Sequence, residues 1–244
     1  MSLASAAQDP GRVRLRSEPE GIAWVEMIDP DGPNALSPPF VSALLAALEA
    51  ASLGKVIVLS GLPEVFCSGA SPALLGALVR GEIAPTELGL TRVLLDLPVP
   101  VIAACEGAAI GGGFALALAC DLLVLAEESR YGLNFMSLGF TPGMGTTRLA
   151  EHVLGPAIAH ELLYTGEFRR GSELRGGVNA VVPRTEVPAK ALDLALRIAA
   201  QPREAIVLLK RTLTLPRRRA LQEALTLESF MHGITLPPLA GRMG

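Results

Sequence analysis

Apolar residues gather in four short runs in the first half of the chain. These runs are "IAWVEMI" (22–28), "KVIVLS" (55–60), "VIAAC" (101–105) and "DLLVLAE" (121–127). Each run is bounded by turn-forming or charged residues, which is typical of buried β-strands. The pattern therefore predicts four strands.

Segments with helical spacing of apolar residues lie between and after these strands. Ser37 has the residue type of an N-cap and Pro38 follows it at the first helical position, so a helix is expected over 37–52. Similar signals predict helices over 71–81 and 86–97. After about residue 145 the strand pattern fades, and the spacing predicts further helices over 147–155, 156–164, 187–201, 203–214 and 218–231. The alternation favours an α/β fold with a helical C-terminal part.

No low-complexity linker divides the chain, and 244 residues are within reach of one large domain. We expect a flexible N-terminal arm over residues 1–20, an α/β core over 21–185 and a helical region over 186–244. Half of the residues are hydrophobic and only 18% are charged, which favours a homo-oligomer that buries part of its surface between subunits.

Charge and targeting signals narrow the function classes. A net charge of −3 argues against nucleic-acid binding, which would show as a basic excess. The most apolar stretch is interrupted by Glu106 and Asp121, which argues against a membrane span. The N-terminus lacks the pattern of a secretory signal, and three cysteines without framework spacing fit reduced thiols. We therefore expect a cytoplasmic protein.

Three consecutive glycines, Gly111, Gly112 and Gly113, separate a strand from a helix of small residues. The third glycine of a dinucleotide fingerprint is missing, and no Gly-Lys-Ser/Thr follows as in a P-loop. What remains is a helix N-terminus whose first N–H groups can face a developing negative charge. The stretch "VFCSGAS" (65–71) also joins a strand to a helix through a glycine. Two backbone N–H groups, one from each turn, could together hold a single oxygen.

Several ordered motifs resemble the crotonase, or enoyl-CoA hydratase/isomerase, superfamily over about residues 20–235. The matching stretches are "FCSGAS", "EGAAIGGGFALALACDLLVLAEESRYG", "LGFTPGMGTTRL" and "LLYTGEFRRGSELRGGVNAVVP". The resemblance implies a crotonase-like spiral of ββα units, a trimer or a dimer of trimers, and a C-terminal region that serves trimerisation and the active site. It also implies an acyl-thioester substrate, carried on CoA or on the phosphopantetheine of an acyl carrier protein, with no other cofactor and no metal. The N–H groups of Ala70 and Gly112 would hold the thioester carbonyl.

The chain departs from the hydratases of this family at two positions. Their two catalytic glutamates correspond to Ala115 and Phe135, and neither residue is an acid here. Addition of water needs an acid and a base, so hydratase activity is not expected. An isomerase also needs a base to remove a proton, so the sequence argues against isomerase activity as well. Decarboxylation of a β- or vinylogous carboxylate needs no base, because loss of CO2 itself creates the enolate.

The stretches "YGLNFMSLGFTPGMGTT" (131–147) and "ESFMHGIT" (228–235) resemble the decarboxylating crotonase-like enzymes of polyketide β-branching. Those enzymes convert a 3-methylglutaconyl group on an acyl carrier protein to a 3-methylcrotonyl group. The resemblance implies that His232 serves the active site, whereas His152 and His160 lie outside any motif and are interpreted as structural or surface residues.

One expected residue is missing. The decarboxylases would carry a lysine in the helix after the "GAS" turn to hold the substrate carboxylate, but Leu78 stands there. Either Arg80 reaches back to hold the carboxylate, or the carboxylate lies in an apolar pocket whose desolvation favours its loss.

The roles of two further polar residues, and two alternative functions of the protein, are left undecided by the sequence. Ser71 and Asn134 are candidates for substrate binding, but a capping or turn role explains each of them equally well. The alternative functions are an enoyl-thioester isomerase or another crotonase-type enzyme, and a catalytically silent subunit that binds acyl thioesters.

Overall fold

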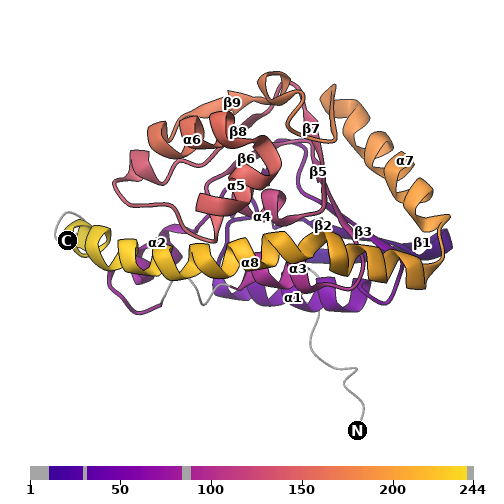
Figure 1. The fold of residues 1–244 in the computed structure, drawn as a ribbon, viewed down its shortest axis with the longest axis horizontal. Coiled ribbons are helices and arrows are strands. Elements are labelled where there is room, and N and C mark those ends of the chain that lie inside the picture. The colour runs from indigo at the N-terminus through magenta and orange to yellow at the C-terminus, as the bar shows by residue number, and fades with distance from the viewer. Residues whose placement is uncertain (1–10, 30–31, 84–88, 241–244) are drawn as a thin grey trace, which may run out of the picture.

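The computed structural model describes residues 11–29, 32–83 and 89–240, which form two β-sheets with helices around them (Figure 1). One sheet has six strands in the order β1-β2-β3-β5-β7-β10 and the other has four in the order β4-β6-β8-β9. The strands of the larger sheet are β1 (Val13–Glu18), β2 (Ile22–Met27), β3 (Val56–Ser60), β5 (Val101–Cys105), β7 (Leu122–Ala126) and β10 (Ala180–Val182). Those of the smaller sheet are β4 (Val65–Cys67), β6 (Ala108–Ile110), β8 (Arg130–Gly132) and β9 (Phe168–Arg170).

A ββ unit repeats along the chain, and each repeat contributes one strand to each sheet. β3 and β4 are followed by α2 (Pro72–Val79), and β5 and β6 by α4 (Gly112–Ala119). β7 and β8 lead, through the short helix η3 (Met136–Leu138), into α5 (Thr146–Leu154). Neighbouring repeats pair in parallel in both sheets. This repetition is the expected crotonase-like spiral of ββα units, so the predicted fold class is confirmed.

Helices cover both faces of the larger sheet (Figure 1). On one face, α7 (Val187–Ala199) packs its alanines against an apolar cluster that includes Trp24 and Ile102. On the other face, α1 (Pro38–Ala51), α3 (Leu90–Asp96) and α4 share the main core. α4 is buried along its whole length, which explains why its sequence is made of small and apolar residues. α6 (Pro156–Thr165) follows α5, and the remaining short helices are η1 (Pro19–Gly21), η4 (Gly171–Leu174), η5 (Arg184–Glu186) and α9 (Pro237–Ala240).

The predicted helix starts are confirmed by their caps. The Ser37 hydroxyl accepts a hydrogen bond from the Phe40 N–H, and Pro38 is the first residue of α1. Ser71 caps α2 in the same way by accepting from the Leu74 N–H at 3.2 Å. The Ser71 hydroxyl is therefore used to cap the start of α2.

The structure differs from the sequence-based expectation in several places. Residues 13–18 fall in the expected flexible arm but form β1, which pairs antiparallel with β2, while residues 1–10 lie outside the described residues. β9 and β10 occur after residue 145, where only helices were expected; each has three residues, too few for an alternating pattern to show. Residues 86–88 of the helix expected over 86–97 also lie outside the described part of the chain, and α3 begins at Leu90.

The two C-terminal helices expected on either side of Pro216 are one helix, α8 (Arg203–Thr235), which runs along the molecule (Figure 1). Proline removes one helical hydrogen bond and normally breaks a helix. Tertiary contacts on both sides of Pro216 outweigh this cost. Lys210 is 4% exposed and donates to Asp121 at 2.6 Å and to the Leu94 carbonyl, and Arg217 donates to the Leu118 carbonyl at the end of α4.

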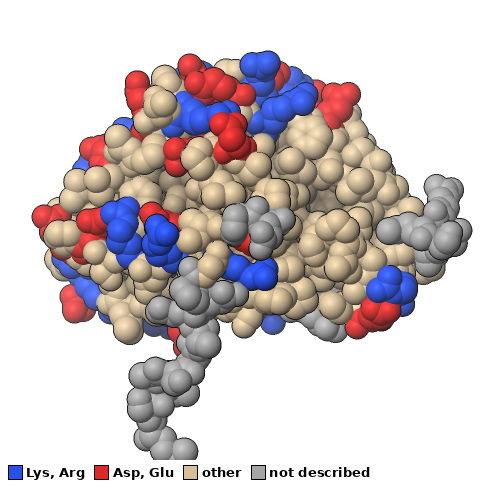
Figure 2. Space-filling model, turned by 180° about the vertical axis from the view of Figure 1, so that it is seen from behind, with Lys and Arg blue, Asp and Glu red and all other residues tan. Residues whose placement is uncertain are grey.

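The surface carries both signs of charge. On the face shown in Figure 2, basic and acidic side chains lie next to one another around the rim, with uncharged surface between these groups. Among the described residues, none of the helices combines the length and hydrophobicity that crossing a bilayer requires.

Candidate functional site

A small apolar cavity lies where the N-termini of α2 and α4 meet the C-terminal end of α8. It has a volume of about 50 Å³. We call it the central cavity, and its lining residues are Leu36, Ala70, Leu75, Leu78, Gly112, Phe135, Phe140, Gly143, Met144, His232 and Leu236. Among these described residues, His232 is the only one with a titratable side chain.

The two predicted backbone donors lie on neighbouring turns at one end of the central cavity. Ala70 follows β4, Gly112 follows β6, and these strands pair in parallel. The turns are tightly packed: a Cβ at Gly69, whose φ is +86°, would lie 2.7 Å from the Ile110 oxygen and 3.5 Å from the Gly112 nitrogen. This approach requires glycine and brings the two turns together.

Neither backbone donor is used by another described residue. Leu36 pairs with the β4 turn by donating to the Gly69 carbonyl at 2.7 Å and accepting from the Ser71 N–H at 3.0 Å, so the Ala70 N–H points away from this bridge. Gly112 is the first residue of α4, where an N–H has no acceptor within the helix. Within the described residues the structure records no acceptor for either N–H. Both donors are available to a ligand oxygen.

His232 is 5% exposed and lies near the end of α8. Its Nε2 lies 3.0 Å from the Thr141 carbonyl oxygen, which can only accept a hydrogen bond, so Nε2 carries the proton in the neutral ring. Nδ1 is then an unprotonated acceptor, buried and without a hydrogen-bond partner among the described residues. Burial lowers the pKa of His232, and the Thr141 and Pro142 carbonyls oppose this change only in part. The His232 ring lines the central cavity and carries a lone pair that has no partner among the described residues.

Glu228, one helical turn before His232, is a buried carboxylate that sequence reasoning did not single out. Its oxygens accept hydrogen bonds from the Gly145 N–H at 2.7 Å, the Thr147 N–H at 3.0 Å and the Thr147 hydroxyl at 2.8 Å. It is 1% exposed, and burial raises its pKa despite these bonds. Glu228 fixes the loop before α5, next to the carbonyl that orients His232. The position of an acid four residues before the histidine was the only sequence signal for it.

The other predicted site residues divide into two groups. Leu78 and Phe135 line the central cavity, as do Ala70, Gly112 and His232. Ala115 is fully buried in the core one turn inside α4 and is not among the lining residues. At the two hydratase positions the structure therefore presents a core methyl group and an aromatic wall.

The polar candidates Ser71, Asn134 and Arg80 do not line the central cavity. Ser71 is the cap of α2 described above. The carbonyl of Asn134 accepts from the Ser137 hydroxyl at 2.8 Å, which is a turn role. Arg80 is exposed and donates to Glu82 at 2.6 Å and 3.0 Å, so it does not reach back into the cavity.

Several lining residues were not predicted. Leu36, Leu75, Phe140, Met144 and Leu236 are apolar, and apolar residues carry no chemical signal in a sequence. Met144 had one local signal: it stands between two glycines in "TPGMG", the kind of loop in which backbone comes close to a ligand.

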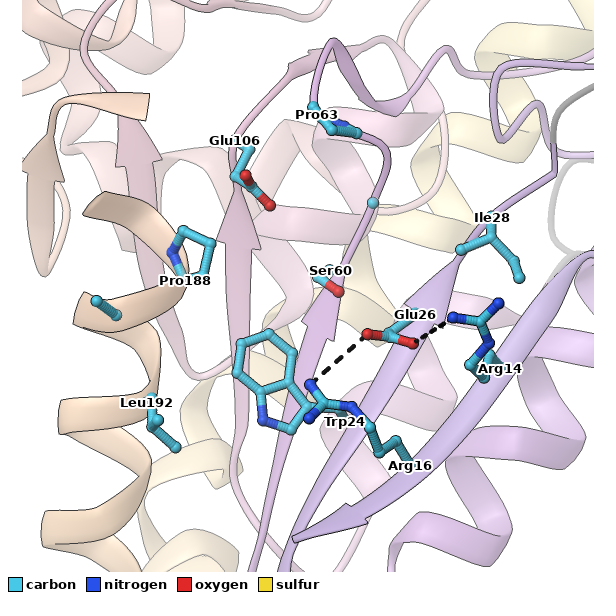
Figure 3. A pocket seen from close by; sticks show the side chains of 12 residues that line it. Arg14, Arg16, Trp24, Glu26, Ile28, Ser60, Pro63, Glu106, Pro188 and Leu192 are labelled. Carbon is cyan, nitrogen blue, oxygen red and sulfur yellow. Dashed lines mark ion pairs between the residues drawn. The ribbon is translucent and has the colours of Figure 1, made fainter. Parts of the chain in front are cut away.

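A larger cleft of about 430 Å³ lies between α7 and the ends of β2 and β3 (Figure 3). Glu26 lies between Arg14 and Arg16 there, with N–O separations of 3.6 Å and 3.7 Å, and the Arg16 guanidinium lies 5.3 Å from the centre of the Trp24 ring. Three of its charged groups thus face one another, Glu106 lies apart from them, and none of the predicted site residues lines the cleft. The central cavity is the candidate site.

Comparison with known proteins agrees with this geometry. The sequence profile of the enoyl-CoA hydratase/isomerase family matches residues 17–240. The bacillaene synthase decarboxylase PksI of Bacillus subtilis (strain 168) is 37% identical over 225 residues, which cover 90% of each chain. The chain belongs to the enoyl-CoA hydratase/isomerase family.

Two solved structures are also similar to this chain. One comes from a dehydratase/decarboxylase enzyme couple involved in polyketide β-branching; it has a TM-score of 0.89 and 37% identity over 92% of this chain and 93% of that one. The other is the ECH2 decarboxylase domain of CurF from Lyngbya majuscula, with a TM-score of 0.87 and 35% identity over 93% and 95% of the two chains. The likeness to decarboxylating members of the family extends over nearly the whole length.

Proposed function

We propose that this protein is a carboxy-lyase that decarboxylates a 3-methylglutaconyl-type thioester to a 3-methylcrotonyl-type thioester in polyketide β-branching. The observation that carries the proposal is the composition of the central cavity: two unused backbone N–H groups, apolar walls and one histidine, with no carboxylate among its described lining residues. Such a site stabilises negative charge on a thioester oxygen, and it has an aromatic wall at Phe135, where the hydratases of this family carry a catalytic glutamate. The decarboxylating relatives support the same reaction class.

The chemistry follows from these groups. The N–H groups of Ala70 and Gly112 bind the thioester oxygen. The bond between the terminal carboxylate and C4 breaks, its electron pair passes through the double bond to the thioester oxygen, and CO2 leaves. Each donor is worth about 3 kcal/mol as the charge develops. One proton then returns to C4, from His232 or from water, and gives the 3-methylcrotonyl product.

The substrate carboxylate meets a largely apolar environment. Arg80 is engaged with Glu82, and Leu78 occupies the position where a lysine was expected. A carboxylate placed there is poorly solvated, whereas CO2 is neutral, so the environment favours loss of CO2. His232 is the polar side chain that can face the carboxylate or supply the proton.

The proposal includes the carrier and the assembly. The thioester is carried on the phosphopantetheine of an acyl carrier protein or on CoA, and no other cofactor or metal takes part. The protein forms a homo-oligomer, a trimer or a hexamer, and acts in the cytoplasm. Support for the oligomer comes from a groove of about 1040 Å³ between α7 and α8, which is lined by Leu209 and Leu213 among others. These leucines are 59% and 64% exposed.

The reaction is tested by mass spectrometry of 3-methylglutaconyl carrier protein after incubation with the purified enzyme. Loss of the mass of one CO2 is expected. An unchanged mass with a moved double bond would instead assign an isomerase. A carrier that is bound but chemically unchanged would show a silent binding subunit and overturn the proposal.

A further inference from the structure

Met144 has an unusual backbone conformation for its residue type. Its φ is +60°, in the left-handed region, and it stands between Gly143 and Gly145. A residue with a Cβ is strained there by about 1–3 kcal/mol, whereas glycine adopts this conformation freely. A methionine thus occupies a position where glycine would fit the backbone without strain. The strain indicates that the Met144 side chain itself has a role.

The Met144 side chain is directed to the proposed oxyanion site. It is 7% exposed and lines the central cavity. Its Sδ lies 3.0 Å from the position that a Cβ on Gly112 would take. The thioether is therefore in contact with the first residue of α4, beside the N–H that the proposed mechanism uses.

The other walls near this point are fixed by specific contacts. Leu36 is held by its bridge to Ala70, the Phe135 ring packs edge-on against Phe140 at 5.9 Å, and His232 is held by the Thr141 carbonyl. The Met144 side chain is unbranched and rotates about three bonds, so it is the most adaptable wall. Its size decides how much room an acyl group finds.

The room is limited: the central cavity has a volume of about 50 Å³, whereas small-molecule sites commonly have ~300–1,000 Å³. We propose that Met144 is a specificity-determining residue that narrows the central cavity beside the oxyanion site and restricts the substrate to short acyl groups. This inference deepens the proposed function and rests on it only in taking an acyl thioester as the ligand.

The experiment measures binding rather than turnover. Dissociation constants are determined by calorimetry for butanoyl-, hexanoyl- and octanoyl-CoA with the wild type, Met144→Gly and Met144→Leu. The wild type should prefer butanoyl-CoA. Met144→Gly fits the left-handed backbone and opens the cavity, so it should reduce the preference for butanoyl- over octanoyl-CoA at least tenfold. Met144→Leu keeps the volume and should retain the preference.

A matched control separates the side chain from the backbone. Glu20 is exposed, has a φ of 68° and lies outside the central cavity, so Glu20→Gly relieves the same kind of strain and should leave the chain-length preference unchanged. A folded Met144→Gly with the wild-type preference would overturn the inference, as would a wild type that binds none of the three thioesters. Failure of the proposed function is distinct, because it appears as missing CO2 release while the binding preference still shifts.

Discussion

At the scale of single residues, neighbouring glycines in the "GGG" motif have different roles. A Cβ on Gly113 would lie 2.1 Å from the Cys67 carbonyl oxygen. One on Gly112 would meet the ends of the Leu36 and Met144 side chains, each at 3.0 Å, and would come no closer to backbone than 3.9 Å, at the Gly69 Cα. The Cys67 backbone is fixed in β4, whereas the ends of the Leu36 and Met144 side chains can rotate away from an added methyl group. Gly113 is thus required for packing, and Gly112 keeps the central cavity open.

This difference gives the first prediction. Gly112→Ala should fold with a melting temperature close to that of the wild type, because alanine is also favoured over glycine in a helix. Its decarboxylation rate should fall at least about tenfold, since the methyl group occupies space beside the N–H donor. Gly113→Ala should lower the melting temperature instead. Thermal unfolding and turnover of both variants check this, and a fully active Gly112→Ala would contradict the role given to this turn.

His232 provides a prediction about pH and rate. If His232 supplies the proton, kcat/KM should rise as the pH falls through its pKa, which burial places below the ordinary value of 6.5. The kcat profile should change at higher pH, because a bound carboxylate raises the pKa of a nearby histidine. The His232→Gln variant should lose this pH dependence, and its decarboxylation rate should fall by a factor of about 10²–10⁴. A wild-type rate in this variant would show that water supplies the proton.

The same pKa shift affects stability. The unfolded chain takes up a proton at His232 near pH 6.5, whereas the folded chain resists protonation until lower pH. Between these two pKa values the unfolded state binds more protons, so stability is complete above pH 6.5 and declines as the pH falls below it. His232→Gln should make the melting temperature less sensitive over this range.

At the scale of elements, α8 holds the loop before α5 through Glu228. In Glu228→Gln, the amide NH2 cannot accept a hydrogen bond, so one of the buried Gly145 and Thr147 N–H groups loses its acceptor. We predict a loss of about 1–3 kcal/mol in the free energy of unfolding. Glu223→Gln on the same helix is the control: Glu223 is exposed and pairs with Arg148, so its loss should cost less than about 1 kcal/mol. Equal effects in urea unfolding would refute the positioning role of Glu228.

The predicted and observed strands and helices show which elements can be predicted from the sequence and which cannot. The four predicted strands became β2, β3, β5 and β7, because each lies inside the larger sheet and is almost entirely apolar. The strands of the smaller sheet have three residues each, too few for periodicity to appear. Pro216 predicted a break that buried contacts of Lys210 and Arg217 override. Local signals predict elements well only where tertiary contacts do not compete with them.

The candidate site follows the same division. The two turns were predictable because glycine-containing turns between a strand and a helix have a physical meaning. Ala70, Gly112 and His232 were assigned through the family resemblance, and all three line the central cavity. Met144 and the other apolar walls were not, since the same residue types fill the core. Arg80 was a candidate by proximity in sequence, but its exposed pairing with Glu82 depends on side-chain direction, which sequence does not give.

At the scale of the whole molecule, exposed apolar side chains predict self-association. Leu213 lies in the groove between α7 and α8 and is 64% exposed. Light scattering should give three or six times the mass of one chain, and Leu213→Glu should shift the protein toward smaller species because a charge in an apolar interface is costly. Leu53, which is 82% exposed and lies outside the groove, is the control. A monomeric wild type, or equal effects of Leu213→Glu and Leu53→Glu, would contradict this assembly.

The parallel pairing of β4 and β6 has a consequence for how such a protein can change over evolutionary time. The Ala70 and Gly112 N–H groups follow adjacent strands, whose separation of about 4.8 Å is a property of any β-sheet. The span between the two donors is thus inherited from main-chain architecture and survives replacement of nearly every side chain around it. In a lineage with this scaffold, the catalytic acid and base side chains can be replaced and the reaction can change, while the two backbone N–H groups proposed to bind the thioester oxygen keep their positions.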